Sequence, residues 1–317
     1  MEVKLLVNLK GKNFLTLQDF PPEELHFLLE TAKDLKRKLK RGEPHEVLKG
    51  KSLAMIFQKP SLRTRVSFEV GMQQLGGYAI YLGPSDIQLG KRETIGDIAR
   101  TLSRYVDGIM ARVFAHSDVE ELAEYATVPV INALSDLLHP CQGLGDLLTV
   151  WEKKGKLKGL KLAFIGDGNN VCNSLLFGCS KLGVNISIGC PKKYEPPKEI
   201  VDKALENAEK SGAKIEILTS PEDAAKEADV IYTDVFVSMG FEKEREERMK
   251  LFLPKYQINK ELVTLAKKDY IFMHDLPAHR GEEVTPEIID DPKHSVVWDQ
   301  AENRLHAQKA ILALTLQ

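Results

Sequence analysis

The chain has 317 residues, of which 43% are hydrophobic and 28% are charged, and its formal net charge is −2. This length suffices for two domains of ordinary size, and the near-neutral charge excludes an overall basic field that would attract nucleic acid or an anionic membrane. We therefore expect a globular protein whose partners are small molecules or proteins, with no nucleic acid and no membrane among them.

The N-terminal residues and the cysteines predict a cytoplasmic location. Residues 1–8 lack the apolar core of a signal peptide, and no segment approaches the ~20 apolar residues of a membrane span. Cys141, Cys172, Cys179 and Cys190 show neither CxxC spacing nor a ligand pattern with histidine. We expect reduced thiols, without a disulfide framework or a metal site.

The first predicted elements alternate between helix and strand. Pro22 opens a helix that ends near Gly42, and its basic end, residues 33–41, predicts a solvated last turn. The apolar run 52–57 predicts a strand, and Ser61-Leu62-Arg63-Thr64-Arg65 then predicts the start of a second helix. Backbone N–H groups, hydroxyls and guanidinium groups at such a start suit a doubly charged anion. An ordinary capped helix with solvated arginines fits this stretch equally well.

The alternation continues to residue 154. Strands are predicted at 78–82, 107–112 and 128–131. Thr94 with Asp97, and Ser117 with Glu120, have the spacing of capping boxes. Each pair predicts the start of a helix between two of these strands, and the first helix runs to Tyr105. His139-Pro140 begins a helix that runs to about Lys154, and we place the boundary of a first domain, residues 1–148, within it.

The second half of the chain repeats this order. It begins with a strand at 161–165, the turn Gly166-Asp167-Gly168-Asn169-Asn170 and a helix that Gly183 ends. Strands then alternate with helices, and an exposed charged helix is predicted at 242–250. We predict an α/β protein of two domains, each an open, mostly parallel sheet with helices on both faces. The remaining strands are expected near 184–189, 214–218, 229–233 and 270–273, the helices near 197–211, 220–228 and 259–267, the second domain at 149–299, and a terminal helix at 300–317.

Polar residues follow most of the predicted strands, where ligands of open α/β sheets bind. In the first domain they offer cations and hydroxyls for a phosphate, and in the second they offer amide, carboxylate and hydroxyl groups for the charged ends of an amino acid. The pattern indicates a reaction that joins two small ligands. The first set is Ser61, Arg63, Thr64, Arg65, Arg112, His139 and Gln142, and the second is Asn169, Asn170, Asp234, Ser238, Met239, Gly240 and residues 274–277.

Several of these residues also have a purely structural explanation. Arg112 fits an ion-pair partner, His139 a residue at a helix start, and Asp234 a turn residue. The turn 166–168 resembles a dinucleotide-binding loop, but the strand after it ends in Gly-Cys-Pro without the acidic residue that binds a ribose. We therefore discount NAD as a cofactor.

Over nearly its whole length the chain resembles the ornithine carbamoyltransferases of the aspartate/ornithine carbamoyltransferase family. The resemblance rests on motifs in a fixed order, among them Ser61-x-Arg63-Thr64-Arg65, Met110-Ala111-Arg112, His139-Pro140-Cys141-Gln142, Ser238-Met239-Gly240, His274-x-Leu276-Pro277 and Trp298 to Arg304.

The resemblance implies transfer of a carbamoyl group from carbamoyl phosphate to the δ-amine of L-ornithine, in a homotrimer or a multiple of trimers, with no metal or organic cofactor. It also implies that the C-terminal helix returns to the first domain, and that Arg112, His139 and Asp275 occupy catalytic positions. Asn170, Asp234, Ser238 and Met239 are the implied ligands of ornithine. The implied ligands of carbamoyl phosphate are Ser61, Leu62, Arg63, Thr64, Gln88 (at a neighbouring subunit's site), Arg112, His139, Gln142, Asp275, Leu276 and Arg304.

Two positions depart from the family pattern. Leu62 stands where the family usually has Thr, and Asp275 stands where it has Cys. Loss of a hydrogen bond to a charged ligand costs about 1.5–3 kcal/mol, and a carboxylate at 275 would hold the attacking amine protonated. Two alternatives therefore stay open: a carbamoyltransferase for another amine, and a binding or assembly homologue of low activity.

Overall fold

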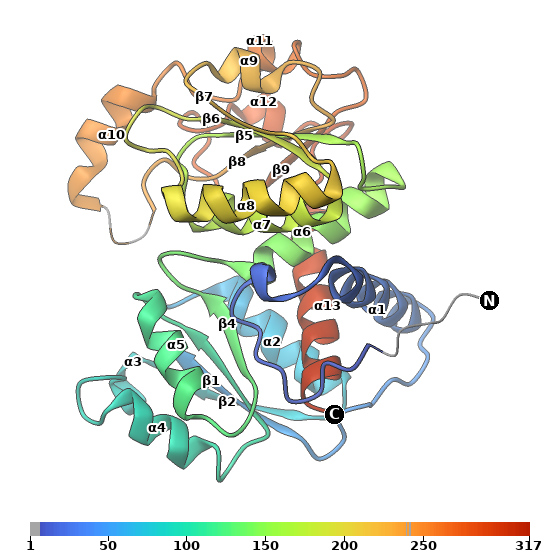
Figure 1. Cartoon of the computed structure of the whole chain (residues 1–317), viewed down its shortest axis with the longest axis vertical. Coiled ribbons are helices and arrows are strands. Elements are labelled where there is room, and N and C mark those ends of the chain that lie inside the picture. Colours follow the sequence, from blue (N-terminus) through green and yellow to red (C-terminus); the bar gives the residue numbers. More distant parts are fainter. Residues whose placement is uncertain (1–6, 239, 241) are drawn as a thin grey trace. The chain divides into compact units, whose positions relative to one another are not determined.

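Two parallel β-sheets organise the chain, whose computed structural model describes residues 7–238, 240 and 242–317. The chain divides into unit 1, which comprises Met1–Leu148 and Asn303–Gln317, and unit 2, which comprises Thr149–Glu302. Strands alternate with helices in both units (Figure 1), so the predicted α/β class is confirmed. None of the described helices is long and apolar enough to cross a membrane.

Unit 1 contains a four-stranded sheet in the order β2-β1-β3-β4. All its pairs are parallel, and the register sets Phe57 opposite Arg112, the last residues of two neighbouring strands. Gln58 N–H accordingly donates to the Arg112 carbonyl at 2.9 Å. The segment after Phe57 therefore begins beside Arg112. The strands are β1 (Ser52–Phe57), β2 (Tyr78–Leu82), β3 (Gly108–Arg112) and β4 (Val130–Leu134).

Helices cover both faces of this sheet. Ala54 and Ile56 of β1 pack with apolar residues of α4 and α5, while Leu53 and Met55 point to the opposite face by strand alternation and are also buried. Figure 1 shows α2 and α13 on that second side. The helices of unit 1 are α1 (Pro22–Lys40), α2 (Leu62–Gln74), α3 (Pro84–Ile87), α4 (Ile95–Leu102), α5 (His116–Tyr125) and the first part of α6 (Pro140–Lys154), which continues into unit 2 after Leu148, with a 3-10 turn η1 (Leu17–Asp19).

The last helix, α13 (Val297–Thr315), returns to unit 1 as predicted. Lys309 donates to Gln74 Oε1 of α2 at 2.8 Å, and Lys36 of α1 donates to Asn303 Oδ1 at 2.7 Å. Both lysines are buried. The prediction of a solvated basic end of α1 is therefore wrong for Lys36, which a terminal helix far away in sequence covers.

Unit 2 contains a five-stranded parallel sheet in the order β7-β6-β5-β8-β9. Thr233 is paired with His274, so the carboxyl ends of β8 and β9 lie together, and β5 is paired with β8 on its other side. The segments that follow these three strands therefore meet at one edge. The strands are β5 (Lys161–Ile165), β6 (Asn185–Gly189), β7 (Ile215–Leu218), β8 (Val230–Thr233) and β9 (Ile271–His274).

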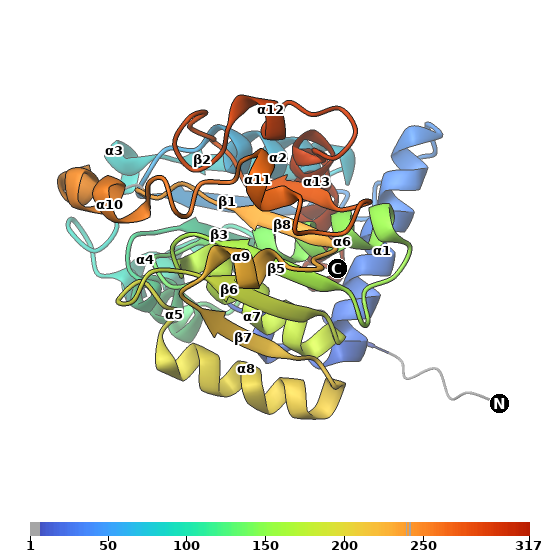
Figure 2. The same cartoon turned by 90° about the horizontal axis from the view of Figure 1, so that it is seen from above.

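Helices lie on both faces of this sheet too. Figure 1 shows α7 and α8 on one face and α9, α11 and α12 on the other, and in Figure 2 α9 and α11 lie in front of the strands. Ala163 and Ile165 pack on the second face against Ala224, Phe252 and Ile288. The helices are α7 (Asn170–Leu182), α8 (Lys198–Ser211), α9 (Pro221–Ala225), α10 (Arg245–Phe252), α11 (Lys260–Val263) and α12 (Pro286–Ile289), with a 3-10 turn η2 (Glu242–Glu244).

Some predicted boundaries were wrong. Ser117 does not cap α5, because that helix already begins at His116, whose N–H donates to Asp136 Oδ1 from a distant loop. Thr94 does cap α4, as predicted, but the helix ends at Leu102 instead of Tyr105. The charged stretch 242–250 is helical, although Arg248 within it is buried.

Candidate active site

The N-terminus of α2 forms one side of the candidate site in unit 1. Ser61 has an extended backbone and caps the helix, because its Oγ accepts a hydrogen bond from Thr64 N–H at 3.3 Å. Ser61 Oγ also donates to Thr64 Oγ1 at 3.1 Å. The first N–H groups of a helix have no intrahelical partner and favour an anion, so this end suits a phosphate.

A buried arginine joins three helices behind this end. Arg304 of α13 donates through Nη1 to Gln142 Oε1 of α6 at 2.5 Å, and through Nη2 to Thr64 Oγ1 of α2 at 3.4 Å. Gln142 Nε2 donates in turn to Asp146 Oδ1 at 2.7 Å. All four side chains are buried. Thr64, Gln142 and Arg304, predicted from distant motifs, are therefore brought together.

His139 lies among the cations of this unit. It is buried, and burial is the largest cause that holds its pKa well below the usual range, followed by the charges of Arg304, Arg112, Lys59 and Arg63. The imidazole is therefore neutral at ordinary pH and offers a hydrogen bond without adding charge. Several cations around one neutral histidine are the arrangement expected for a site that takes a multiply charged anion.

Lys59 is a member of this group that the sequence reasoning missed. Its side chain is buried, with Nζ 4.9 Å from the centroid of the Phe114 ring. Burial and the charge of Arg112 lower the pKa of Lys59 to about 8, against the opposing effect of Asp136. The sequence feature that indicates a role for Lys59 is its position between β1 and Ser61, in a segment that the sequence analysis treats only as a break between strand and helix.

The side chains of Arg65 and Leu62 do not join this group in unit 1, and Gln88 is expected at a neighbouring subunit's site. Arg65 stacks over the Tyr81 ring, 3.9 Å from its centroid, and its Nε donates to Glu69 Oε1 at 3.0 Å, so the two arginines of the motif do not converge. Leu62 is 75% exposed. Gln88 is an exposed residue at the end of α3 with a positive φ of 46°.

Unit 2 brings the turn after β5 to the residue after β8. Asn169 caps α7 by accepting from Val171 N–H and Cys172 N–H, both at 3.1 Å, and its Nδ2 donates to Asp234 Oδ2 at 2.6 Å. Asp234 Oδ1 accepts from Val235 N–H at 2.6 Å. The predicted ligand Asn170 is the first residue of α7, next to this contact.

The other predicted residues after β8 lie further along the same segment. Ser238 is partly buried, while Met239 lies outside the described residues.

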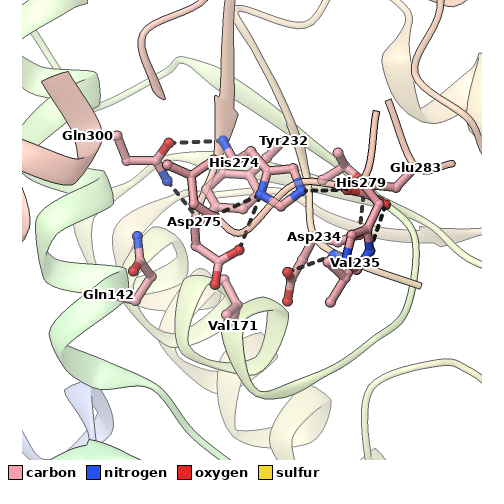
Figure 3. A network of polar contacts seen from close by, with 12 residues as sticks. Gln142, Val171, Tyr232, Asp234, Val235, His274, Asp275, His279, Glu283 and Gln300 are labelled. Atoms are coloured by element: carbon pink, nitrogen blue, oxygen red, sulfur yellow. Dashed lines mark hydrogen bonds and ion pairs between the residues drawn. The ribbon is translucent and has the colours of Figure 1, made fainter. Parts of the chain in front are cut away.

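A buried polar network follows β9 (Figure 3). His274 Nδ1 accepts from Leu276 N–H at 2.9 Å, so Nε2 carries the proton and donates to Glu283 Oε1 at 3.2 Å. His274 N–H donates to Gln300 Oε1 at 2.9 Å, and Gln300 Nε2 donates to Tyr232 Oη at 3.0 Å. The network fixes the tautomer of His274 and the position of Leu276. Glu283 had not been singled out, because nothing distinguishes it from its charged neighbours in the sequence.

Asp275 points to the same edge of the sheet, with Oδ1 3.5 Å from His274 Nδ1. One ligand atom from each of Asp234, His274 and Asp275 lies within 4.8 Å of the others. Both ring nitrogens of His274 and both carboxylate oxygens of Asp234 already have hydrogen bonds. The remaining lone pairs of Asp234 favour an ammonium group, which donates hydrogen bonds to them, over a metal ion, which would displace the contacts of Asp234 and His274.

Comparisons with known proteins cover both units. Residues 12–152 match the family described as "Aspartate/ornithine carbamoyltransferase, carbamoyl-P binding domain", and residues 158–315 match "Aspartate/ornithine carbamoyltransferase, Asp/Orn binding domain". Among curated proteins, the chain is 61% identical over 312 residues to an ornithine carbamoyltransferase of Pyrococcus horikoshii, with 98% of each chain covered.

Solved structures give the same result. The ornithine carbamoyltransferase of Pyrococcus furiosus is 60% identical with a TM-score of 0.95, covering 98% of this chain and 99% of that one. The ornithine carbamoyltransferase of Thermus thermophilus is 44% identical with a TM-score of 0.86, covering 96% of this chain and 99% of that one.

Proposed function

Because the chain belongs to the aspartate/ornithine carbamoyltransferase family, we propose that it moves the carbamoyl group of carbamoyl phosphate to the δ-amine of L-ornithine, giving L-citrulline and phosphate. The observation that carries the proposal is the group of cations around neutral His139 in unit 1, of which Lys59, Arg112 and Arg304 are buried and Arg63 is partly buried. Unit 1 is the proposed carbamoyl phosphate-binding domain, and unit 2 the proposed ornithine-binding domain.

Carbamoyl phosphate takes its phosphate to the N-terminus of α2. Ser61, Arg63, Thr64 and the backbone of Leu62 hold the phosphate, and Arg304 joins them through Thr64. The exposed side chain of Leu62 means that this position contributes through its N–H group, and replacement of the family's Thr removes only a side-chain contact. Gln142, Asp275 and Leu276 complete the proposed ligand set, with Gln88 contributed to a neighbouring subunit's site.

The carbonyl oxygen of the carbamoyl group accepts hydrogen bonds from Arg112, His139 and Thr64. Negative charge develops on this oxygen when the δ-amine nitrogen attacks the carbamoyl carbon, and donors fixed in advance stabilise it. The amine nitrogen gives a proton to the departing phosphate, the carbon–oxygen bond to phosphate breaks, and phosphate leaves as an anion that the arginines already neutralise. Alignment of the two bound reactants supplies the rest of the acceleration.

Ornithine binds to the residues that follow β5, β8 and β9. Asn170, Asp234, Ser238 and Met239 hold its α-amino and α-carboxylate groups, and Asp275 attracts the δ-ammonium before the proton is lost. The hydrogen bonds among Asn169, Asp234 and Val235 hold the Asp234 carboxylate in place for this purpose.

The proposed assembly is a homotrimer or a multiple of trimers in the cytoplasm. Exposed apolar side chains on α2 and the edge strand β2 support an interface between subunits, since Leu62, Val66, Tyr78 and Ile80 are 38–75% exposed. All four cysteines are buried free thiols, as suits a reducing compartment. A relative from Pyrococcus furiosus, 60% identical, is described as anabolic, which supports a role in arginine biosynthesis.

A panel of amine acceptors tests the substrate. Purified protein is supplied with carbamoyl phosphate and, in separate reactions, ornithine, lysine, putrescine or aspartate, and product formation is followed for each. We expect ornithine to have the highest kcat/KM, because Asp234 and its neighbours bind the charged α-groups that putrescine lacks. A higher kcat/KM for any other amine would overturn ornithine as the substrate.

A further inference from the structure

Arg248 of α10 is a buried cation with partners from three parts of unit 2. Its Nη1 donates to Asp167 Oδ2 at 2.6 Å and to the Phe236 carbonyl at 3.2 Å, and its Nε donates to Glu244 Oε2 at 2.9 Å. The guanidinium carbon lies 4.7 Å from the centroid of the Tyr194 ring. Only 5% of the residue is exposed, so the arginine lies inside the unit.

Two of these partners belong to the segments that carry the proposed ornithine ligands. Asp167 is in the turn between β5 and α7, three residues before Asn170, and Phe236 lies between Asp234 and Ser238. One guanidinium group therefore holds both segments at once. Its planar fork allows this, because it presents several N–H donors in a fixed geometry.

The turn 166–170 also contacts the Tyr194 segment, which in turn contacts Arg248. Gly168 N–H donates to the Tyr194 carbonyl at 2.8 Å, while the Tyr194 ring contacts Arg248. At Gly168 a Cβ atom would lie 2.7 Å from the backbone carbon of Glu195 and closer still to Pro196, so only glycine fits this approach. The position of the turn thus depends on the Tyr194 segment and on Arg248 together.

Stability alone does not account for this arrangement. Burial raises the pKa of Asp167, against the opposing charge of Arg248, so the carboxylate is costly to keep in place. Buried ion pairs of this kind are often no more stabilising than apolar residues of the same volume. A buried pair that joins two ligand-bearing segments is better explained by the geometry it imposes.

We propose that Arg248 is a positioning residue for ornithine, which fixes the turn 166–170 and the segment 234–238 in the relative placement that binds the α-groups of the amino acid. The inference rests on the proposed function. It assigns Arg248 no contact with either substrate.

The main test replaces Arg248 by Met, which has similar length but cannot donate. We expect the KM for ornithine to rise by about tenfold or more, the effect of ~1.4 kcal/mol, while the KM for carbamoyl phosphate stays within about twofold, because none of its proposed ligands lies in the two segments that Arg248 holds. Arg248→Lys should recover part of the affinity for ornithine, since one ammonium reaches one partner but not both segments. Arg245→Met is the matched control, because that exposed arginine of the same helix pairs with Glu282 instead.

The double variant Asp167→Asn/Arg248→Met separates positioning from charge neutralisation. If Arg248 only compensated the buried carboxylate, the double variant would recover both thermal stability and the wild-type KM for ornithine, and the proposal would be overturned. Positioning predicts recovered stability with a KM for ornithine that stays raised.

The wild type provides the reference for the proposed function. Citrulline formation by the wild type with an unchanged KM for ornithine in Arg248→Met would overturn the inference alone. A wild type that forms no citrulline would overturn the proposed function and this inference with it.

Discussion

His139 and the cations around it set the chemistry expected at the scale of single residues. A neutral imidazole among Arg112, Arg304, Lys59 and Arg63 leaves the net charge of the group positive, so an anion gains from every member. The structure distinguishes residues that contribute to this group from neighbours in the same motif that do not. Arg63 and Arg65 are only two positions apart, yet Arg63 is among the charges that lower the pKa of His139, while Arg65 stacks over the Tyr81 ring.

Arg63→Ala should weaken carbamoyl phosphate binding while leaving the fold intact. Loss of hydrogen bonds to a charged ligand costs about 1.5–3 kcal/mol, or roughly ten- to a hundredfold in affinity. Calorimetric titration gives the affinity, and thermal unfolding checks the fold. Arg65→Ala is the control and should bind normally, because Arg65 engages Glu69 and Tyr81. Equal affinities for wild type and Arg63→Ala would mean that the phosphate site is misplaced.

Lys59 should make carbamoyl phosphate binding depend on pH. The bound phosphate favours protonated Lys59, whose pKa in the free protein is about 8. Affinity should therefore be full below that pKa and fall as the pH rises through it, by about tenfold between pH 7 and 9 if binding requires the charged form. Titrations across this range measure the effect.

Two variants give the control for this dependence. Arg stays charged throughout the range, so Lys59→Arg should lose the fall in affinity above pH 8. Lys59→Met should bind more weakly at every pH and also show no fall. If the wild-type fall persists in Lys59→Met, another group is responsible.

Asp275 should set the pH dependence of the reaction. A carboxylate near the δ-ammonium stabilises the charged amine and raises its pKa, whereas only the neutral amine attacks. Asp275→Cys and the isosteric Asp275→Asn should therefore shift the rising limb of citrulline formation to lower pH, by on the order of one unit. Rates across pH at low ornithine concentration measure the shift. An unchanged limb in both variants would show that Asp275 does not face the amine.

At the scale of helices and strands, the sequence predicted those bounds and helix starts that depend on residues close by in the chain. Ser52–Phe57 and Tyr78–Leu82 were correct to the residue, because each is a short apolar run with a turn signal at its end. The start of a helix at about Ser61 was also predicted correctly, from the short break after the apolar strand. These features are local, so no distant segment decides them.

The features that sequence reasoning missed depend on partners outside their own helix or turn. Lys36, Arg248 and Glu283 are buried charged residues in charged stretches, and they have hydrogen bonds with Asn303, Asp167 and His274, respectively. Periodicity gives no sign of such a partner. Most site residues were named from their positions after predicted strands, and Gln88 and Arg304 only from the family resemblance, whereas the composition of the cationic group, with Lys59 included and Arg65 excluded, required the structure.

Alanine substitutions at Gly168 and Gly71 test how closely the neighbouring segments approach the backbone at each position. Gly168→Ala should destabilise the protein by about 1–3 kcal/mol, because its Cβ would collide with backbone atoms of Glu195 and Pro196 that cannot move aside. Gly71→Ala is the matched control, since in α2 the new Cβ would lie 3.4 Å from Lys309 Cγ, an ordinary contact. Alanine is also favoured over glycine within helices by about 0.5–1 kcal/mol. Denaturant unfolding of both variants gives the comparison, and equal midpoints would contradict it.

At the scale of the whole molecule, each unit presents its candidate residues where parallel strands end, as in other open α/β sheets. In unit 1 these ends carry cations, and in unit 2 they carry carboxylates and amides. This division suits one anionic and one cationic reactant. It also explains why neither half of the chain alone is expected to carry out the transfer.

The most direct measurement is multiple turnover with carbamoyl phosphate labelled with ¹³C at the carbonyl carbon. Purified protein with saturating labelled carbamoyl phosphate and ornithine is followed by NMR for the ureido carbon of citrulline. We expect many labelled citrulline molecules per chain, formed at a rate proportional to protein concentration. In Arg63→Ala the rate should fall when the carbamoyl phosphate concentration that saturates the wild type no longer saturates the variant. Binding of carbamoyl phosphate with no labelled citrulline, or with at most one per chain, would contradict the account and identify the protein as a binding homologue.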